Sequence, residues 1–311
     1  MSEIILITGA NGQLGSVLTP FLQEKHGINN VIASDIYKKD LFYGIFEIID
    51  ATDIKKLNKV VLKYKVTVIY HLAAILSANG ERSPLNSWNI NTTTWFNVLE
   101  TSRINSLNKI FFPSSIAVFG PSAIKEQTPN KSIQDPTTVY GMSKSNGELW
   151  ASYYNLKYNL DIRSIRYPGV ISYQSVPQGG TTDYAVDIFH KAIQGKKFNC
   201  NIKSSTIIPM IYINDAIRAT DLLMESPSES IKVRTSYNVS GVSFSPIDLV
   251  NTILKIIPEF KIEYNPDICE KIASQWPNSI NDDEAKNDWG WKPEYSLEKI
   301  THEMIKKLKT P

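Results

Sequence analysis

The chain has 311 residues, of which 42% are hydrophobic and 21% are charged, a composition typical of a folded protein with a large core. Its 33 basic and 31 acidic residues give a formal net charge of +2. Because neither sign is in excess, the composition argues against a nucleic-acid-binding protein and against one that binds a membrane surface. The apolar runs are also shorter than a membrane span, so we expect no membrane partner.

Cysteine and histidine are few and scattered along the chain. The two cysteines, Cys200 and Cys269, have no metal-ligand spacing, and the four histidines form no HxxxH or HxH pair. We therefore expect no metal ion and two reduced thiols, with a disulfide between them as the alternative. No basic segment or cleavage site precedes the first apolar run, so the cytoplasm is the expected location.

Short apolar runs alternate with amphipathic stretches over the first half of the chain. The runs have the length of strands, and the longer stretches carry apolar residues at helical spacing. This alternation predicts a doubly wound parallel sheet with helices on both faces, an α/β fold of the Rossmann type. The expected strands are Ile4–Ile7, Val31–Ala33 (ending at Asp35), Phe46–Ile49, Val66–Leu72, Lys109–Pro113 and Asp161–Ile165, and the expected helices lie near 14–23, 54–64, 85–102 and 138–158.

The pattern changes after Tyr167, where Pro168 and Gly169 begin a stretch richer in proline and glycine. Helical spacing recurs at 184–192, 214–224 and 246–256, between segments of mixed character. We therefore expect a first domain over residues 1–166 and a smaller mixed α/β lobe over residues 167–311. The boundary is not expected to be clean, because segments of the second lobe could return to the main sheet.

A glycine-rich turn follows the first strand, with Gly9, Gly12 and Gly15 spaced three apart. One glycine permits a tight turn, one lets the backbone approach a pyrophosphate, and one allows close packing of helix and strand. The next helix presents free N–H groups and the positive end of its dipole to phosphate. A glycine triplet alone is a weak signal, but its place at the first strand-to-helix junction predicts a dinucleotide site.

Asp35 ends the second strand, 20 residues after Gly15. A carboxylate at this place accepts hydrogen bonds from the adenosine ribose and repels a 2′-phosphate, which favours NAD over NADP. Lys38 and Lys39 lie nearby and partly offset that repulsion. A loop aspartate that faces solvent is the competing interpretation of Asp35.

Asp50 follows the third strand and suits a contact to the adenine amino group. A helix cap formed by Thr52 or Asp53 is the competing explanation of this region.

Tyr140 and Lys144 are four residues apart on a predicted helix, so their side chains lie on one face, one turn apart. A free phenol has a pKa near 10, but a nearby ammonium and the positive ring of NAD⁺ both favour the phenolate. The phenolate can then take the proton of a substrate hydroxyl. The pattern also arises by chance on helix surfaces. Ser115, at the end of the fifth strand where parallel sheets bind ligands, strengthens the catalytic interpretation.

The order and spacing of several motifs resemble those of the extended short-chain dehydrogenases, the NAD-dependent epimerase/dehydratase family. The motifs are the glycine triplet, Asp35, His71-Leu72-Ala73-Ala74, Asn91, Ser115, and the pair Tyr140 and Lys144. The resemblance implies NAD as the cofactor. It also implies that Ser115 binds the reacting oxygen, Tyr140 acts as acid and base, and Lys144 holds the ribose hydroxyls. The implied cofactor contacts are Gly9, Asn11, Gly12, Gln13, Leu14, Gly15, Asp35, Ile36, Asp50, Ala51, Leu72, Ala73, Ala74, Asn91, Tyr140, Lys144 and Tyr167.

Two further stretches, AILSA at 74–78 and GGTTDYA at 179–185, are similar to short-chain L-threonine dehydrogenases of this family. The similarity implies oxidation of the β-hydroxyl of L-threonine to L-2-amino-3-oxobutanoate, with NAD reduced to NADH. Asp183 would pair with the substrate ammonium. The other implied substrate contacts are Ser77, Thr181 and Thr182, whose hydroxyls suit the carboxylate, and Ser115 and Tyr140. A helix cap at Thr182 or Asp183 is the competing explanation.

Two other functions stay open from the sequence. A nucleotide-sugar 4-epimerase or dehydratase is the commonest activity in this family, but the second lobe offers few arginines, Arg218 and Arg234, for a nucleotide. A redox sensor that keeps the fold without the chemistry has no need to retain Tyr140, Lys144 and Ser115.

The resemblance also implies a homodimer formed through the helices near 85–102 and 140–158. Five aromatic residues could form an apolar contact face on these helices, or they could cover the sheet instead. They are Trp88, Trp95, Trp150, Tyr153 and Tyr154.

Overall fold

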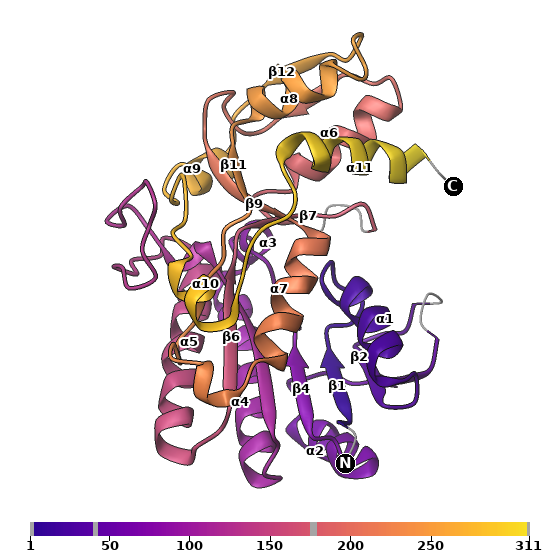
Figure 1. The fold of residues 1–311 in the computed structure, drawn as a ribbon, viewed down its shortest axis with the longest axis vertical. Coiled ribbons are helices and arrows are strands. Elements are labelled where there is room, and N and C mark those ends of the chain that lie inside the picture. The colour runs from indigo at the N-terminus through magenta and orange to yellow at the C-terminus, as the bar shows by residue number, and fades with distance from the viewer. Residues whose placement is uncertain (1–2, 40–42, 175–178, 310–311) are drawn as a thin grey trace.

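The computed structural model describes residues 3–39, 43–174 and 179–309. Within these ranges, seven strands form one parallel sheet in the order β10-β6-β5-β4-β1-β2-β3, with helices on both faces (Figure 1). The predicted α/β fold of the Rossmann type is therefore confirmed. The first part contains β1 (Ile5–Thr8), α1 (Gly15–His26), β2 (Val31–Asp35), β3 (Ile45–Ile48), α2 (Ile54–Tyr64), β4 (Val68–His71), α3 (Ser77–Gly80), α4 (Pro84–Ile104), β5 (Lys109–Ser115), η1 (Ile116–Val118), α5 (Val139–Tyr158) and β6 (Ile162–Tyr167).

The second part of the chain contributes small mixed sheets and further helices. In the described ranges, β11, β9 and β7 form a three-stranded sheet, and β12 pairs with β8. The helices α6, α8 and α11 pack together at one end of the molecule (Figure 1). The elements are β7 (Gly169–Ile171), α6 (Tyr184–Ile193), β8 (Phe198–Cys200), β9 (Ile208–Tyr212), α7 (Ile213–Glu225), η2 (Ser228–Ser230), β10 (Tyr237–Asn238), β11 (Val242–Phe244), α8 (Pro246–Leu254), β12 (Ile262–Tyr264), α9 (Ile268–Ala273), α10 (Asp283–Trp289) and α11 (Leu297–Lys309).

The main sheet is buried on both faces, which explains its nearly continuous apolar strands. Side chains alternate along a strand. Ile5 and Ile7 therefore join one core cluster with residues of α1 and α7, whereas Leu6 joins the other cluster with residues of α2, α4 and α5. Two segments from beyond residue 167 return to this sheet. β10 extends its edge beside β6, and α7 packs on β6.

The structure also differs from the expected elements. β2 ends at Asp35, as expected, whereas β6 continues beyond Ile165 to Tyr167, because it stays paired with β5 there. α3 and η1 were not predicted, since an element of a single turn shows no periodicity. Pro20 lies inside α1.

Among the described residues, no helix combines the length and the apolar character needed to cross a membrane.

The aromatic residues expected on a dimer face divide into two groups. Trp95 is 2% exposed and stacks on Phe112 with 4.3 Å between ring centroids, and Tyr154 is also buried. These two side chains therefore cover the sheet, which is the alternative considered for them from the sequence. Tyr153 is 44% exposed and stays available for contact.

Candidate active site

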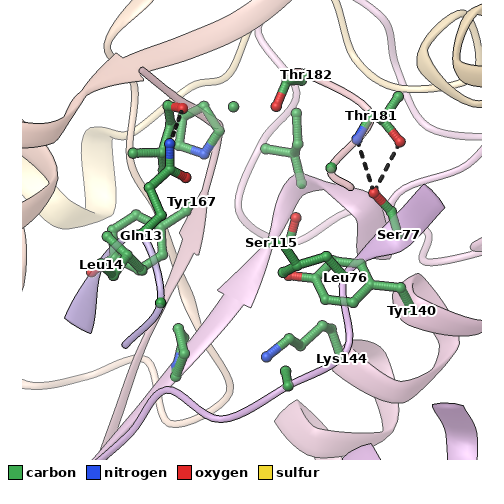
Figure 2. Close-up of a pocket in the computed structure, with 18 of the residues that line it drawn as sticks. Gln13, Leu14, Leu76, Ser77, Ser115, Tyr140, Lys144, Tyr167, Thr181 and Thr182 are labelled. Carbon is green, nitrogen blue, oxygen red and sulfur yellow. Dashed lines mark hydrogen bonds between the residues drawn. The ribbon is translucent and has the colours of Figure 1, made fainter. Parts of the chain in front are cut away.

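A pocket opens at the carboxyl ends of β1, β4, β5 and β6, and the second part of the chain forms its other side (Figure 2). Open parallel sheets bind ligands at this edge. Most of the site residues expected from the sequence line this one pocket. They are Gly9, Gly12, Gln13, Leu14, Gly15, Leu72, Ala74, Ser77, Ser115, Tyr140, Lys144, Tyr167, Thr181, Thr182 and Asp183.

The glycine-rich turn has the shape that a pyrophosphate cradle needs. Gly9 has φ +76°, and a Cβ there would lie 2.6 Å from the amide nitrogen of Ala73. A Cβ on Gly15 would lie 2.4 Å from the carbonyl oxygen of Gly9. Leu14 precedes α1 and gives it no side-chain cap. The N–H groups of Ser16 and Val17 already donate to the carbonyls of Gly12 and Leu14, so the helix offers an anion the positive end of its dipole. The turn therefore fits the diphosphate of NAD.

Asp35 braces this turn from the end of β2. Its carboxylate accepts hydrogen bonds from the backbone N–H groups of Asn11, at 2.9 Å, and Ile36, at 2.8 Å. The Asn11 amide donates to the carbonyl of Tyr37 at 2.6 Å, and Lys39 donates to the Asn11 carbonyl at 3.0 Å. Asp35 is therefore not a free loop carboxylate. It lies beside the turn, where an adenosine ribose would be bound.

Asp50 is engaged within its own loop. Its Oδ1 accepts hydrogen bonds from the backbone N–H of Thr52, at 2.9 Å, and from the Thr52 hydroxyl, at 2.7 Å. These bonds lower the pKa of Asp50. Asp53 caps α2 by accepting from Lys55 and Lys56, so of the two caps considered, Asp53 forms one. An adenine contact by Asp50 stays a prediction.

Seven expected cofactor residues lie outside the pocket lining. Asn91 connects the segment after β4 to α5. Its Oδ1 accepts from the N–H of Ile75, and its Nδ2 donates to the Ile75 carbonyl and, at 3.2 Å, to the Ser143 hydroxyl on α5. Ala73 packs its backbone against Gly9. The full set is Asn11, Asp35, Ile36, Asp50, Ala51, Ala73 and Asn91.

Tyr140, Lys144 and Ser115 converge in the pocket (Figure 2). Thr138 caps the helix that carries the first two, by accepting a hydrogen bond from the N–H of Gly141 at 3.1 Å. The Tyr140 hydroxyl lies beside Ser115 in the pocket, and Ser115 acts to lower the pKa of Tyr140 (Figure 2). The Lys144 ammonium lies 4.7 Å from the centroid of the Phe112 ring and 5.5 Å from that of Tyr140.

Burial dominates the charge state of both groups. It raises the pKa of Tyr140 to about 12, against the opposing effect of the Ser115 hydrogen bond. It lowers the pKa of Lys144 to about 7, against the opposing charge of Glu148. Burial therefore dominates the phenol pKa in the protein alone, and the expected lowering by Lys144 together with oxidised NAD stays a prediction.

The 179–183 turn forms the substrate side of the pocket. Ser77 and Thr181 share a hydrogen bond of 2.9 Å between their hydroxyls, and the Thr181 N–H donates to Ser77 at 3.2 Å. Asp183 lines the pocket, and its Oδ2 accepts from the N–H groups of Gly179, at 2.8 Å, and Gly180, at 2.9 Å. Asp183 occupies the N-cap position of α6 but makes no capping bond.

The sequence interpretation missed three residues beside the site. Trp276 reaches the pocket from the end of the second part, and no spacing rule connects it to the catalytic residues. Glu148 and Arg166 form a buried ion pair behind the pocket, with 2.7 Å between nitrogen and oxygen. The available signal was the position of Glu148, four residues after Lys144 on the same helix face.

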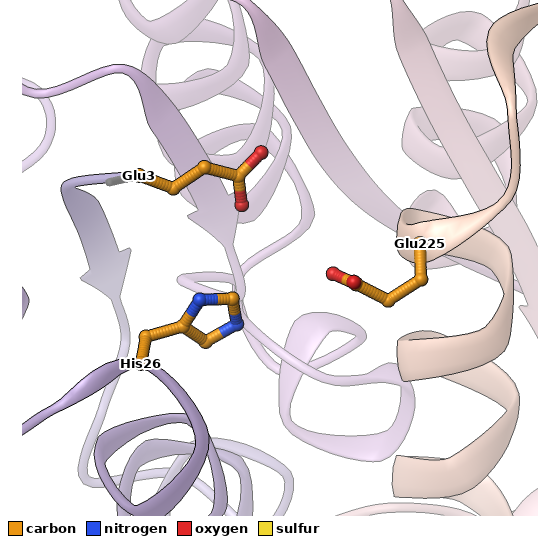
Figure 3. A group of neighbouring side chains, drawn as sticks. All are labelled: Glu3, His26 and Glu225. Carbon is orange, nitrogen blue, oxygen red and sulfur yellow. The ribbon is translucent and has the colours of Figure 1, made fainter. Parts of the chain in front are cut away.

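A separate group of possible metal ligands, Glu3, His26 and Glu225, lies away from this pocket (Figure 3). Their ligand atoms lie within 4.8 Å of one another. Glu3 also pairs with Lys109 at 2.7 Å, and Glu225 pairs with Lys25 at 3.5 Å. Glu3 precedes β1, so the group lies at the opposite edge of the sheet from Tyr140. The expectation of no metal stays a prediction.

The comparisons with known proteins agree along the chain. The model of the NAD dependent epimerase/dehydratase family matches residues 5–240. The mitochondrial L-threonine 3-dehydrogenase of Bos taurus is 43% identical over 97% of this chain and 81% of that protein. The solved holo form of a GalE-like L-threonine dehydrogenase from Cupriavidus necator is 47% identical, with a TM-score of 0.96 over 98% of this chain and 99% of that one.

A solved monomeric L-threonine 3-dehydrogenase from a metagenome is 43% identical, with a TM-score of 0.96 over 98% of each chain. The family match and the glycine cradle together confirm NAD as the cofactor. This chain belongs to the NAD dependent epimerase/dehydratase family.

Proposed function

We propose that this protein is an NAD-dependent L-threonine 3-dehydrogenase, which oxidises the β-hydroxyl of L-threonine to give L-2-amino-3-oxobutanoate. The observation that carries the proposal is the convergence of Tyr140 and Ser115 in one pocket with the Ser77–Thr181 hydroxyls (Figure 2). The names of the relatives that cover nearly the whole chain support the same activity. NAD, when bound, accepts the hydride that leaves the β-carbon.

Tyr140 removes the proton of the substrate hydroxyl, and Ser115 donates a hydrogen bond that orients the same oxygen. Because burial alone raises the pKa of Tyr140, the phenolate needs the positive charges of Lys144 and of the oxidised cofactor beside it. Lys144 also holds the ribose hydroxyls. This arrangement links proton removal to the presence of the oxidised cofactor.

The remaining cofactor contacts are proposed at the residues named from the sequence. Gly9, Gly12 and Gly15 with Gln13 and Leu14 surround the diphosphate, and Leu72 and Ala74 line the cleft. Asp35, already held beside the turn, binds the adenosine ribose and favours NAD over NADP.

The substrate is a small zwitterion and needs both charges matched. We assign its ammonium to Asp183, whose carboxylate lines the pocket while it holds the Gly179–Gly180 turn. The hydroxyls of Ser77, Thr181 and Thr182 are assigned to its carboxylate. This division gives the first domain, 1–166, most of the cofactor contacts. The substrate contacts are shared, with Ser77, Ser115 and Tyr140 in the first domain and Thr181, Thr182 and Asp183 in the second lobe, 167–311.

A substrate panel tests the function. NADH formation is measured with L-threonine, L-allo-threonine, L-serine and UDP-sugars at saturating NAD. L-Threonine is expected to give the highest kcat/KM, and L-serine, which lacks one methyl group, about ten-fold less or lower. Turnover of UDP-sugars without oxidation of L-threonine would assign the protein to the epimerase and dehydratase activities instead.

We also propose a homodimer through α4 and α5. Leu149 and Leu156 are 64% and 87% exposed on α5, the helix that also carries the 44% exposed Tyr153. Light scattering is expected to give twice the chain mass, and Leu156→Glu to give one chain mass. Leu62→Glu, at an exposed leucine of α2, is the matched control. A wild-type protein that is monomeric at micromolar concentration contradicts the dimer.

The cytoplasm is the proposed location. Cys200 and Cys269 are both free and buried, as expected for a reducing compartment.

A further inference from the structure

Glu148, on the catalytic helix α5, is buried and fully hydrogen-bonded. It is 1% exposed and pairs with Arg166, which is 2% exposed. Oε1 accepts from the Ser114 hydroxyl at 2.5 Å and from Nε of Arg166 at 2.8 Å. Oε2 accepts from Gln134 at 2.9 Å and from Nη2 of Arg166 at 2.7 Å. We call Glu148, Arg166, Ser114 and Gln134 the Glu148 cluster.

Two partners in the Glu148 cluster, Ser114 and Arg166, are next to residues of the pocket, and Ser114 itself contributes to the pocket lining. Ser114 precedes Ser115 on β5, and the two side chains point to opposite faces because side chains alternate along a strand. Arg166 pairs in register with Ser114 and precedes Tyr167 on β6. Glu148 lies two turns after Tyr140 on α5. The cluster therefore joins the three elements that carry Ser115, Tyr167 and Tyr140.

Stability alone does not explain such a pair. Burying two charges costs desolvation energy, and apolar residues of similar size often stabilise a fold equally well. The other buried pair on β6 differs, because Arg163 also donates to the carbonyls of Leu223 and Met224 at the end of α7. The Glu148 cluster ends no helix. Arg166 also donates to the Asn130 carbonyl at 2.7 Å and to the Asn238 side chain on β10 at 3.1 Å, whereas the contacts of Glu148 with Ser114 and Arg166 are directed at the ends of β5 and β6.

We propose that Glu148, neutralised and oriented by Arg166, is a positioning residue that holds β5 against α5 through Ser114 and so fixes Ser115 relative to Tyr140. The inference rests on the proposed function. Both hydroxyls must reach one substrate oxygen, and displacements well under an ångström slow such reactions markedly. The tether acts on the residue adjacent to Ser115, so a small shift of Ser114 moves the catalytic hydroxyl directly.

The charge of Glu148 has a second consequence that agrees with this position. It opposes the effect of burial on the pKa of Lys144. The Glu148 carboxylate therefore both fixes the position of Ser115 and favours the charged form of Lys144.

Ser114→Ala tests the tether without changing any charge. The measurement is a single-turnover experiment, with enzyme and NAD in excess over L-threonine, followed by NADH absorbance. If L-threonine is not oxidised, the experiment uses whichever compound of the substrate panel is oxidised. Failure of the proposed function is thereby distinguished from failure of the tether proposal. We expect the rate constant of single-turnover NADH formation to fall about ten-fold, while the amplitude of the absorbance change stays at the wild-type value and the affinity for NADH stays within two-fold.

Ser164→Ala is the matched control. Ser164 is a buried serine on β6 that donates to the Ser236 hydroxyl at 2.8 Å and has no link to α5. It is expected to keep the wild-type rate constant. A Ser114→Ala enzyme within two-fold of the wild-type rate constant overturns the proposal, and so does one that loses only amplitude, which indicates partial unfolding.

A pair of double variants separates the tether from the charges. Glu148→Gln with Arg166→Met removes both charges but keeps an amide oxygen that accepts from Ser114, whereas Glu148→Met with Arg166→Met removes that acceptor. We expect the glutamine version to react about ten-fold faster than the methionine version. Equal rate constants overturn the tether. If neither double variant folds, Ser114→Ala and its control decide alone.

Discussion

Tyr140→Phe is expected to lower kcat for L-threonine by about 10³-fold, in the range of a lost general base, while NADH affinity stays within about three-fold. Only the phenolic oxygen is removed, and this oxygen lies beside Ser115 in the pocket (Figure 2). The glycine cradle and Asp35, which hold the rest of the cofactor, are untouched. Steady-state kinetics and NADH fluorescence titration measure the two effects.

Tyr264→Phe is the control for this variant. Its hydroxyl is buried in the second part of the chain and has no hydrogen-bond partner among the described residues. It is expected to leave kcat unchanged. If Tyr140→Phe instead weakens NADH binding by a hundred-fold, or keeps a tenth of the activity, Tyr140 is not the proton acceptor.

Lys144→Met is expected to abolish oxidation and to stabilise the cofactor-free protein at pH 7. The pKa of Lys144 falls from 10.5 to about 7 on folding, because the ammonium loses its solvent. Between these values the unfolded chain binds more protons, so the wild-type free energy of unfolding rises with pH, by at most about 1.4 kcal/mol per unit. The variant lacks the free-energy cost of burying the Lys144 ammonium. This cost reaches a few kcal/mol below pH 7 and vanishes above pH 10.5.

Urea unfolding at pH 7 and pH 9.5 measures this difference. The variant is expected to be more stable by roughly 2–4 kcal/mol at pH 7, with a gap that narrows at pH 9.5. Lys157→Met, at an exposed lysine of the same helix, controls for the loss of a lysine and should change little. A Lys144→Met protein that is less stable than wild type at pH 7 means that the ammonium is better stabilised than its burial indicates.

The parts of the site that the sequence predicted are those fixed by local structure. Gly9, Gly12 and Gly15 follow directly from a strand-to-helix turn, and Tyr140 and Lys144 follow from helical spacing. Ser115 needed only the rule that parallel strands end at the ligand side. Each of these inferences uses residues of one element or one junction, so the fold adds little to them.

The parts that the sequence missed depend on contacts between distant elements. Glu148 and Arg166 lie on a helix and a strand whose packing no local pattern records. The pKa of Tyr140 is raised because the folded chain buries the phenol, which no local pattern in the sequence shows. β10 has two residues, too few for any periodic signal, yet it completes the sheet beside β6.

Asp183 shows an intermediate case. The resemblance pointed to its stretch correctly, because the residue does line the pocket. The sequence did not show that its carboxylate also holds the turn through Gly179 and Gly180. Because these backbone hydrogen bonds orient the Asp183 carboxylate before the substrate binds, less conformational entropy is lost on binding.

The central claim is oxidation at the β-carbon of L-threonine, and the fate of one deuterium tests it directly. The protein is incubated with NAD and L-threonine deuterated at C3, and the NADH is analysed by mass spectrometry. We expect NADH that carries one deuterium, and unlabelled NADH from L-threonine deuterated at C2. Unlabelled NADH from the C3-labelled substrate, or no NADH from either, would contradict the assignment.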